Sequence, residues 1–180
     1  MTLCALALFC TSAVGAALLD TTGSEYQVKA AFLFNFTKYV KWPESAFDNE
    51  RSPIVVAVVG DDPFGRLLDE ALHDKAIGAR KYEVRRFKTA EDLEACHVLF
   101  VSASESTKIA KIGEHYASTS TLLIGDTEHF AVRGGAIGFY FEDKKTRFEI
   151  NTDATKRATL ELSSQLLKLA RIVKDEKGEH

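Results

Sequence analysis

Six consecutive apolar residues, Ile54–Val59, set strict limits on the architecture of this chain. They read Ile-Val-Val-Ala-Val-Val, and β-branched residues of this kind favour strands. A strand that lacks alternating polar positions is covered on both faces, as in parallel sheets packed between helices. The run therefore predicts an α/β fold built around a buried, largely parallel sheet.

The rest of the chain alternates short strands with helical segments. We expect strands at 82–87, 97–101, 121–124, 135–141 and 146–150, and helical segments at 66–72, 89–94 and 105–116. The polar turn Glu142–Lys145 joins the last two strands into a hairpin, and one long amphipathic helix, about Asp153–Val173, is expected to follow it. This order predicts an α/β single-domain sandwich: a mixed, mostly parallel sheet flanked by helices, with a C-terminal β-hairpin followed by a long helix.

The first helix of the domain is expected over residues 24–40, with Ser24 as its N-cap. Its apolar positions occupy more than one stripe, and such a helix is either buried or part of a contact surface. Phe32, Phe36 and Tyr39 are accordingly candidates for an exposed interaction surface. On this interpretation, Phe36→Asp weakens self-association or partner binding and leaves the domain folded.

The N-terminal segment is typical of an export signal. The chain carries no charged side chain before Asp20, and a short apolar run is followed by small residues. We expect residues 1–17 to be a signal peptide, cut after Ala16 or Ala17. The alternative is a retained membrane anchor, for which the segment is short and diluted by polar residues. The domain is then expected over residues 25–173, with a solvated tail at 174–180.

The cysteines divide between these regions. Cys4 and Cys10 lie in the predicted signal peptide, so the exported chain keeps Cys96 alone. One cysteine cannot form an internal disulfide. Because Cys96 stands at the entry to a predicted strand, we interpret it as a small buried hydrophobic residue rather than a reactive thiol.

The sequence gives little sign of catalysis, metal binding or nucleic-acid binding. The net charge of −3 provides no general attraction for phosphate backbones. The five histidines stand at no zinc-like spacing. Asp61 and Asp62 follow a strand as the acidic pair of a receiver domain does, but the matching stretch 100–104 has no acceptor aspartate. We therefore prefer Asp62-Pro63 as a turn former and helix cap. We expect no catalytic residue, metal or cofactor, and a hydrolase or phosphoacceptor is the weakest hypothesis.

The strand at 146–150 and its flanks carry the candidate binding residues. Arg147, Glu149 and Asn151 alternate and share one face, while the residues between them face the core. Arg157, about one helical turn into the predicted last helix, can approach the same place. The set is either a surface ion pair of about 0–1 kcal/mol, or a recognition patch that orients a zwitterionic ligand or a partner's polar groups.

Several motifs, in order and at similar spacing, resemble the YfiR family. They are Tyr26–Pro43, Val59–Gly65, Cys96–Phe100, Gly134–Ile137, Arg147–Asn151 and Leu160–Ala170. The resemblance covers residues 25–173. Each motif alone is weak, and together they are specific.

The resemblance implies a periplasmic α/β protein without enzymatic activity. Its implied partner is the periplasmic sensor domain of an inner-membrane diguanylate cyclase, which it represses in cyclic-di-GMP and biofilm control. The best-known member also implies an outer-membrane lipoprotein as a second partner, a homodimer, and redox sensing through disulfides. This chain departs from the last property because Cys96 stands alone. A different hypothesis, based on the patch around Arg147, is a periplasmic small-ligand sensor or binding protein.

Overall fold

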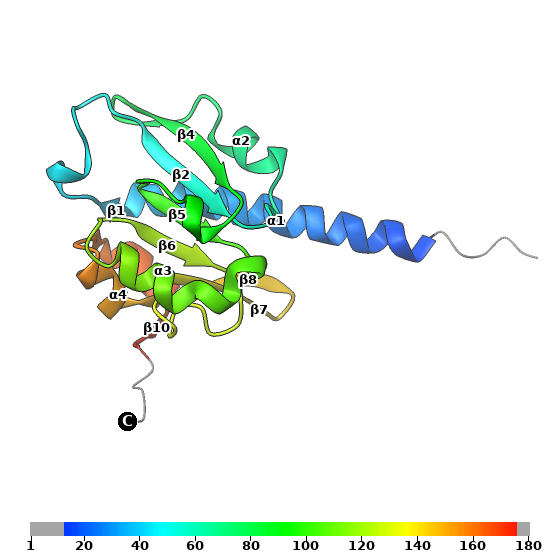
Figure 1. Cartoon of the computed structure of the whole chain (residues 1–180). Helices are drawn as coiled ribbons and strands as arrows, with labels where there is room; N and C mark the ends of the chain where they lie inside the picture. Colours follow the sequence, from blue (N-terminus) through cyan, green and yellow to red (C-terminus); the bar gives the residue numbers. More distant parts are fainter. Residues whose placement is uncertain (1–12, 176–180) are drawn as a thin grey trace, which may run out of the picture.

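The computed structural model describes residues 13–175 (Figure 1). Residues 1–12 of the predicted signal peptide, including Cys4 and Cys10, and residues 176–180 of the predicted tail lie outside the described residues. Within residues 13–175, no helix has both the length and the apolar character that crossing a bilayer requires.

An eight-stranded mixed sheet forms the centre of the molecule. Its strands are β2 (Ile54–Val59), β3 (Ala76–Ile77), β4 (Arg80–Phe87), β5 (Val98–Val101), β6 (Leu122–Gly125), β7 (Ile137–Glu142), β8 (Lys145–Asn151) and β10 (Arg171–Val173). They are ordered β10-β8-β7-β6-β5-β2-β4-β3. The five strands from β7 to β4 run parallel, and β3 and β8 are antiparallel to their inner neighbours. The predicted mixed, mostly parallel sheet is confirmed.

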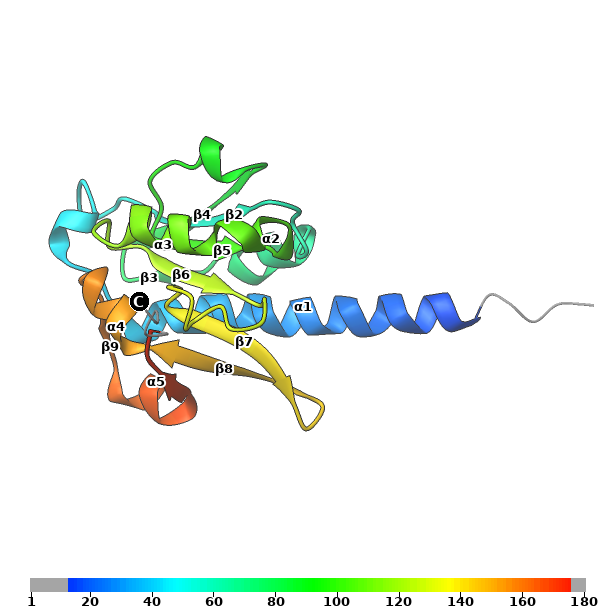
Figure 2. The ribbon, with the colours of Figure 1, turned by 60° about the horizontal axis from the view of Figure 1, so that its bottom comes forward.

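Helices cover both faces of this sheet (Figure 2). They are α1 (Ala13–Tyr39), α2 (Arg66–Leu72), α3 (Ile109–Tyr116), α4 (Thr152–Arg157) and α5 (Ser164–Leu169), with the 3-10 segments η1 (Glu44–Ala46), η2 (Ala90–Asp92) and η3 (Ala103–Lys108). The short strands β1 (Val40–Lys41) and β9 (Glu161–Leu162) form a separate antiparallel pair. The α/β sandwich flanked by helices is thus confirmed.

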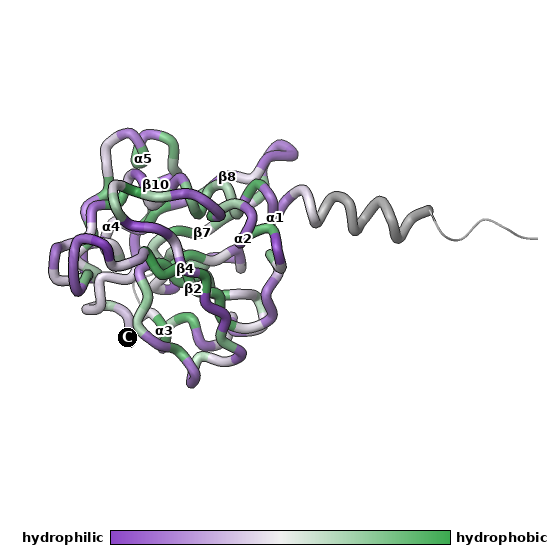
Figure 3. Tube along the Cα trace, turned by 90° about the horizontal axis from the view of Figure 1, so that it is seen from above, coloured by the Kyte–Doolittle hydropathy of each residue, from purple (hydrophilic) through white to green (hydrophobic). Residues whose placement is uncertain are grey.

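The core has two layers, one on each side of the sheet. Val56 of β2 packs with Phe36 in the layer beneath α1, while its neighbour Ala57 packs with Ile112 in the layer beneath α3. All six residues of β2 are buried. This explains why the strand has no polar position, and Figure 3 shows hydrophobic residues concentrated in the central strands.

The hairpin prediction is confirmed in its details. Strands β7 and β8 pair antiparallel out to Glu142 and Lys145. The two residues between them, Asp143 and Lys144, have φ angles of 51° and 59°. Two consecutive positive φ angles are typical of the type I′ turn, whose twist matches that of the flanking strands.

The predicted start of the first helix is wrong. Helix α1 is already present at Ala13, the first described residue, and Ser24 lies inside it as an exposed residue instead of capping it. The stretch before Ser24 includes Ala16, Ala17, Leu18 and Leu19. Alanine and leucine have high helix propensity, so the helix continues through a serine that could have started one.

The long C-terminal helix is also wrong. Helix α4 ends at Arg157, and Thr159 has a φ of 55°, a left-handed conformation that stops a helix. The chain then forms β9, α5 and the edge strand β10, which is parallel to β8. Serine favours caps over helix interiors, and the Ser163 hydroxyl accepts a hydrogen bond from the Leu166 N–H at 3.3 Å to begin α5.

Candidate functional site

The usual ligand position of a parallel α/β sheet is filled in this molecule. Ligands commonly bind where the strand order reverses, here at the carboxyl ends of β2 and β5. A Cβ added to Gly60, which has a φ of +90°, would lie 2.3 Å from the hydroxyls of both Ser102 and Ser104. The Asp61 N–H also donates to the Ser104 hydroxyl at 2.9 Å. These serines pack directly against the strand end.

Of the two aspartates after β2, Asp62 stabilises the turn that follows. Asp62 accepts a hydrogen bond from the Phe64 N–H at 2.8 Å, which confirms the turn former. The predicted helix cap is wrong, because the N-cap of α2 is Gly65, without a side-chain bond. Arg86 holds the Asp62 carboxylate at 2.6 Å.

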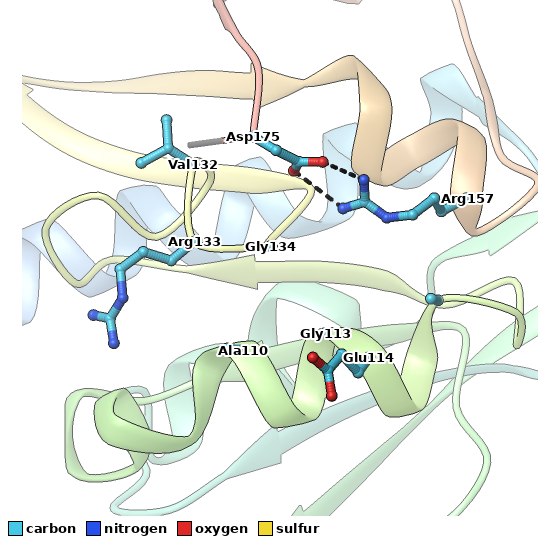
Figure 4. A pocket seen from close by; sticks show the side chains of 9 residues that line it. Ala110, Gly113, Glu114, Val132, Arg133, Gly134, Arg157 and Asp175 are labelled. Atoms are coloured by element: carbon cyan, nitrogen blue, oxygen red, sulfur yellow. Dashed lines mark hydrogen bonds and ion pairs between the residues drawn. The ribbon is translucent and has the colours of Figure 1, made fainter. Parts of the chain in front are cut away.

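A groove of about 580 Å³ lies between α3, the loop before β7 and the C-terminal segment (Figure 4). It is lined by Ala110, Gly113, Glu114, Ala117, Val132, Arg133, Gly134, Arg157 and Asp175. Gly113 brings α3 close to the loop, since a Cβ there would lie 3.2 Å from the Gly134 carbonyl oxygen. We take this groove as the candidate site, because it contains one of the binding residues predicted from the sequence, Arg157.

Asn151 stands behind the groove and is fully buried. It ends β8 and caps α4, because its Oδ1 accepts from the N–H groups of Asp153 (2.9 Å) and Ala154 (3.1 Å). Its Nδ2 donates to the Ala131 carbonyl at 2.8 Å and to Asp175 Oδ1 at 2.7 Å. Both amide hydrogens and the amide oxygen of Asn151 are therefore used.

Arg157 and Asp175 form a two-pronged ion pair at the mouth of the groove (Figure 4). Arg157 Nη2 donates to Asp175 Oδ1 at 3.1 Å, and Nη1 donates to Oδ2. The guanidinium, with help from Asn151, lowers the pKa of Asp175 below its ordinary value. A carboxylate held by a fork of N–H donors is a strong charge-assisted arrangement.

The other two predicted binding residues have separate partners. The buried Glu149 carboxylate accepts from Arg171 Nη2 at 2.6 Å and Nε at 3.2 Å. Arg147 lies toward the hairpin turn, where its Nε is 3.0 Å from Glu142 Oε2. The structure thus joins Asn151 and Arg157 through Asp175, and it leaves Arg147 outside the groove.

Sequence reasoning missed Asp175 and Arg171, which complete these contacts. Both lie in the stretch interpreted as helix and solvated tail, where no strand was expected. The signal was the pair Ile172-Val173, two β-branched residues in a stretch otherwise rich in charge. That pair forms most of β10, which brings Arg171 opposite Glu149.

Comparison with known proteins identifies the family. The family model described as YfiR/HmsC-like matches residues 26–171. This chain belongs to the YfiR/HmsC-like family. No curated protein is significantly similar to it in sequence.

A solved structure similar to this YfiR/HmsC-like chain is the crystal structure of a conserved domain protein from Vibrio cholerae O1 biovar El Tor strain N16961. The two share 11% sequence identity with a TM-score of 0.58. The match covers 83% of this chain and 60% of the other, so this chain spans less than two thirds of that protein. At this identity the likeness shows the fold alone.

The three residues of this YfiR/HmsC-like chain that were predicted to form an exposed interaction surface differ in burial. Phe36 is only 1% exposed, so its assignment to an exposed surface is wrong, whereas Phe32 and Tyr39 are half-buried. The reason is the aromatic cluster in which Phe36 packs against Phe148 at 4.9 Å. Among the described residues, the large apolar side chains that are exposed are Val28, Phe141, Leu169 and Ile172.

Cys96 is buried, as the sequence indicated. Burial raises the pKa of its thiol to about 12, so the thiol stays protonated at neutral pH. Among residues 13–175, no three side chains of His, Cys, Asp or Glu gather closely enough to hold a metal ion.

Proposed function

We propose that this protein is a non-enzymatic periplasmic regulator that binds and represses a membrane-bound signalling protein, a diguanylate cyclase. The observation that carries the proposal is the YfiR/HmsC-like family match over residues 26–171. The expected export signal at residues 1–17 agrees with a periplasmic location. The proposed partner is the periplasmic sensor domain of the cyclase, with an outer-membrane lipoprotein and a second copy of this chain as further partners.

Repression of this kind works through binding alone. A regulator shifts its target only by binding one state of the target more tightly than the other. Moving a two-state target from 1:99 to 99:1 takes an affinity ratio of about 10⁴. The regulator therefore needs a stable, specific surface, and no chemical step in its own groove.

The experiment is reconstitution with a membrane-bound diguanylate cyclase that carries a periplasmic sensor domain. Membranes containing that cyclase receive increasing amounts of the exported protein, and cyclic-di-GMP production is measured. We expect inhibition that saturates at a fixed molar ratio of the two proteins. The isolated sensor domain should relieve it by competing. Full cyclase activity at saturating regulator, with no binding to the sensor domain, would refute the proposal.

Half-buried aromatic residues of α1 are the proposed contact residues. Phe32 and Tyr39 keep part of their rings accessible, and Phe36 leaves the set because it is core. Tyr39→Ala should weaken capture of the sensor domain. The exposed Lys41→Ala, two residues further along, serves as the matched control because its pair with Glu161 is solvent-exposed.

The groove supports a second candidate function, that of a small-ligand sensor. Its volume of about 580 Å³ lies within the range of small-molecule sites. A screen of amino acids and small metabolites by thermal melting tests this. A ligand of the groove should raise the melting temperature, and Arg157→Ala should abolish the rise. Arg147→Ala should leave it unchanged, because Arg147 lies by the hairpin turn.

A further inference from the structure

We propose that the groove contains a carboxylate-binding site, formed by Asn151 and Arg157, which the chain's own Asp175 occupies and which a small organic carboxylate takes in its place. The inference rests on the ligand-binding candidate above and names its ligand class. It is independent of the regulatory proposal, which concerns a protein surface.

The site is organised without Asp175. Three of the four hydrogen bonds of the Asn151 side chain go to the backbone of Ala131, Asp153 and Ala154, and these fix the amide. The fourth, from Nδ2, points to Asp175 Oδ1. If Asp175 leaves, one N–H of a fully buried amide loses its partner, and an unsatisfied buried donor is destabilising. The site therefore requires an acceptor.

The charge of the groove favours an anion as this acceptor. Its lining contains the cations Arg133 and Arg157 and the anions Glu114 and Asp175, which balance. Without Asp175, the lining keeps two cations and one anion, and Asp153 remains as a further carboxylate acting on Arg157. Arg157 donates to both carboxylate oxygens of Asp175, and this fork geometry fits a planar carboxylate.

The occupant can leave without breaking the sheet. Strand β10 ends at Val173, and Asp175 follows two residues later. Its side chain is 37% exposed and is held by Asn151 and Arg157. Exchange thus displaces the Asp175 side chain and leaves β10 in place.

The rest of the groove defines the body of the ligand. Ala110, Gly113, Ala117 and Val132 present small and apolar surfaces beside the ion pair. A carboxylate with a compact apolar body matches this lining, whereas an inorganic anion uses only the polar end. The ligand class is therefore small organic carboxylates.

The experiment is rescue of a variant that lacks the internal carboxylate. Asp175→Ala is melted in 100 mM sodium acetate, sodium hexanoate, sodium phosphate or sodium chloride, all at equal ionic strength. Relative to chloride, we expect acetate and hexanoate to raise the melting temperature by about 2–4 °C, the size of a ligand effect in a domain of this length. Unaltered protein should need at least tenfold more acetate for the same rise.

The controls separate this site from general salt effects. Asp175→Ala combined with Arg157→Met should lose the acetate response. Equal responses of all three proteins, or none in Asp175→Ala, would refute the site, and a larger response to phosphate would refute the carboxylate assignment. If Asp175→Ala does not fold, Asp175→Ser, which also lacks the internal carboxylate and is shorter, provides the test. Cyclase binding by these variants is measured in parallel, so a failure here is distinguished from a failure of the regulatory proposal.

Discussion

His97 connects the segment after α1 to the sheet through two hydrogen bonds. The Val55 N–H donates to His97 Nδ1 at 3.0 Å, and His97 Nε2 donates to the Ala46 carbonyl at 2.9 Å. The Phe47 ring stacks on the imidazole with centroids 4.4 Å apart. Nδ1 accepts a hydrogen bond only in the neutral ring. Burial lowers the pKa of His97, and the guanidinium groups of Arg80 and Arg85 lower it further. The hydrogen bond to the Ala46 carbonyl and the charge of Asp48 raise this pKa, but the net shift is downward.

This geometry predicts that acid weakens the fold through His97. The unfolded histidine takes up a proton as the pH falls through about 6.5, while the folded one resists protonation. The contribution of His97 is therefore complete above pH 6.5 and is lost below it, by at most about 1.4 kcal/mol per pH unit. Urea unfolding at pH 7.5, 6.5 and 5.5 measures it. His97→Gln should lose less stability over this range, and parallel curves would contradict the assignment.

Phe36 and Phe141 form a matched pair of core and surface positions. Phe36 is 1% exposed and Phe141 is 65% exposed. Phe36→Ala should destabilise the domain by about 3–5 kcal/mol, and Phe36→Asp should prevent folding. Phe141→Asp should change stability by no more than about 0.5 kcal/mol. Circular dichroism with urea unfolding checks both, and a folded, stable Phe36→Asp would restore the surface hypothesis.

At the scale of elements, the edge strand β10 is attached by a charge as well as by backbone bonds. Arg171 neutralises the Glu149 carboxylate and stacks its guanidinium over the Tyr140 ring at 4.1 Å. Glu149 needs room opposite, and Gly138 provides it, since a Cβ there would lie 3.2 Å from Glu149 Oε1. β10, β8 and β7 are thus coupled through side chains.

Removing the Arg171–Glu149 pair should cost more stability than removing the exposed Arg147–Glu142 pair. Arg171→Ala leaves a buried carboxylate without its cation and should cost about 1–3 kcal/mol. Arg147→Ala removes an exposed pair with Glu142 and should cost about 0–1 kcal/mol. Guanidinium unfolding compares the two variants. Equal losses would show that the Glu149 pair has no special weight.

Elements with strong local signals could be predicted from the sequence. Segments 54–59 and 66–72 match β2 and α2 at both ends, because β-branched residues and the preceding turn specify them locally. The segment after α4 could not be predicted, because its apolar residues recur at helical spacing although they belong to three short elements. Leu160 and Leu166 reach the core from either side of β9. Tertiary pairing of β9 with β1 and of β10 with β8 overrides the helical pattern.

The candidate site was predictable only in part for the same reason. Alternation along β8 correctly placed Phe148 and Ile150 in the core, but it did not predict that Glu149 and Asn151 are buried as well. Their partners Arg171 and Asp175 come from an edge strand and the residues after it, which depend on long-range contacts. The charge balance of the groove therefore emerged only from the structure.

In the molecule as a whole, α1 is tied to the sheet by buried charge. Lys29 Nζ lies 2.6 Å from the Asp126 carboxylate at the end of β6, and the Tyr26 hydroxyl donates to the same group at 2.8 Å. Lys29 is 4% exposed. Loss of one partner from a buried ion pair costs about 3–5 kcal/mol. Separation of α1 from the sheet therefore has a large free-energy cost.

This predicts that the domain unfolds in one step. Trp42, the only tryptophan, follows β1 and lies 6.4 Å from the His97 ring, so its fluorescence reports on the end of α1. Far-ultraviolet circular dichroism reports on all helices. The two urea transitions should coincide, as expected of a two-state domain. Separate midpoints would show that the segment after α1 unfolds independently.

Because Asp175 is on the same chain as Arg157, it affects the concentration at which a free ligand can bind. A tethered group stays at an effective concentration that dilution cannot change, commonly on the order of millimolar for short flexible links. Any free carboxylate that binds the Arg157 guanidinium must displace the Asp175 carboxylate. Asp175 therefore sets a threshold concentration, and metabolites below it leave the ion pair with Arg157 intact.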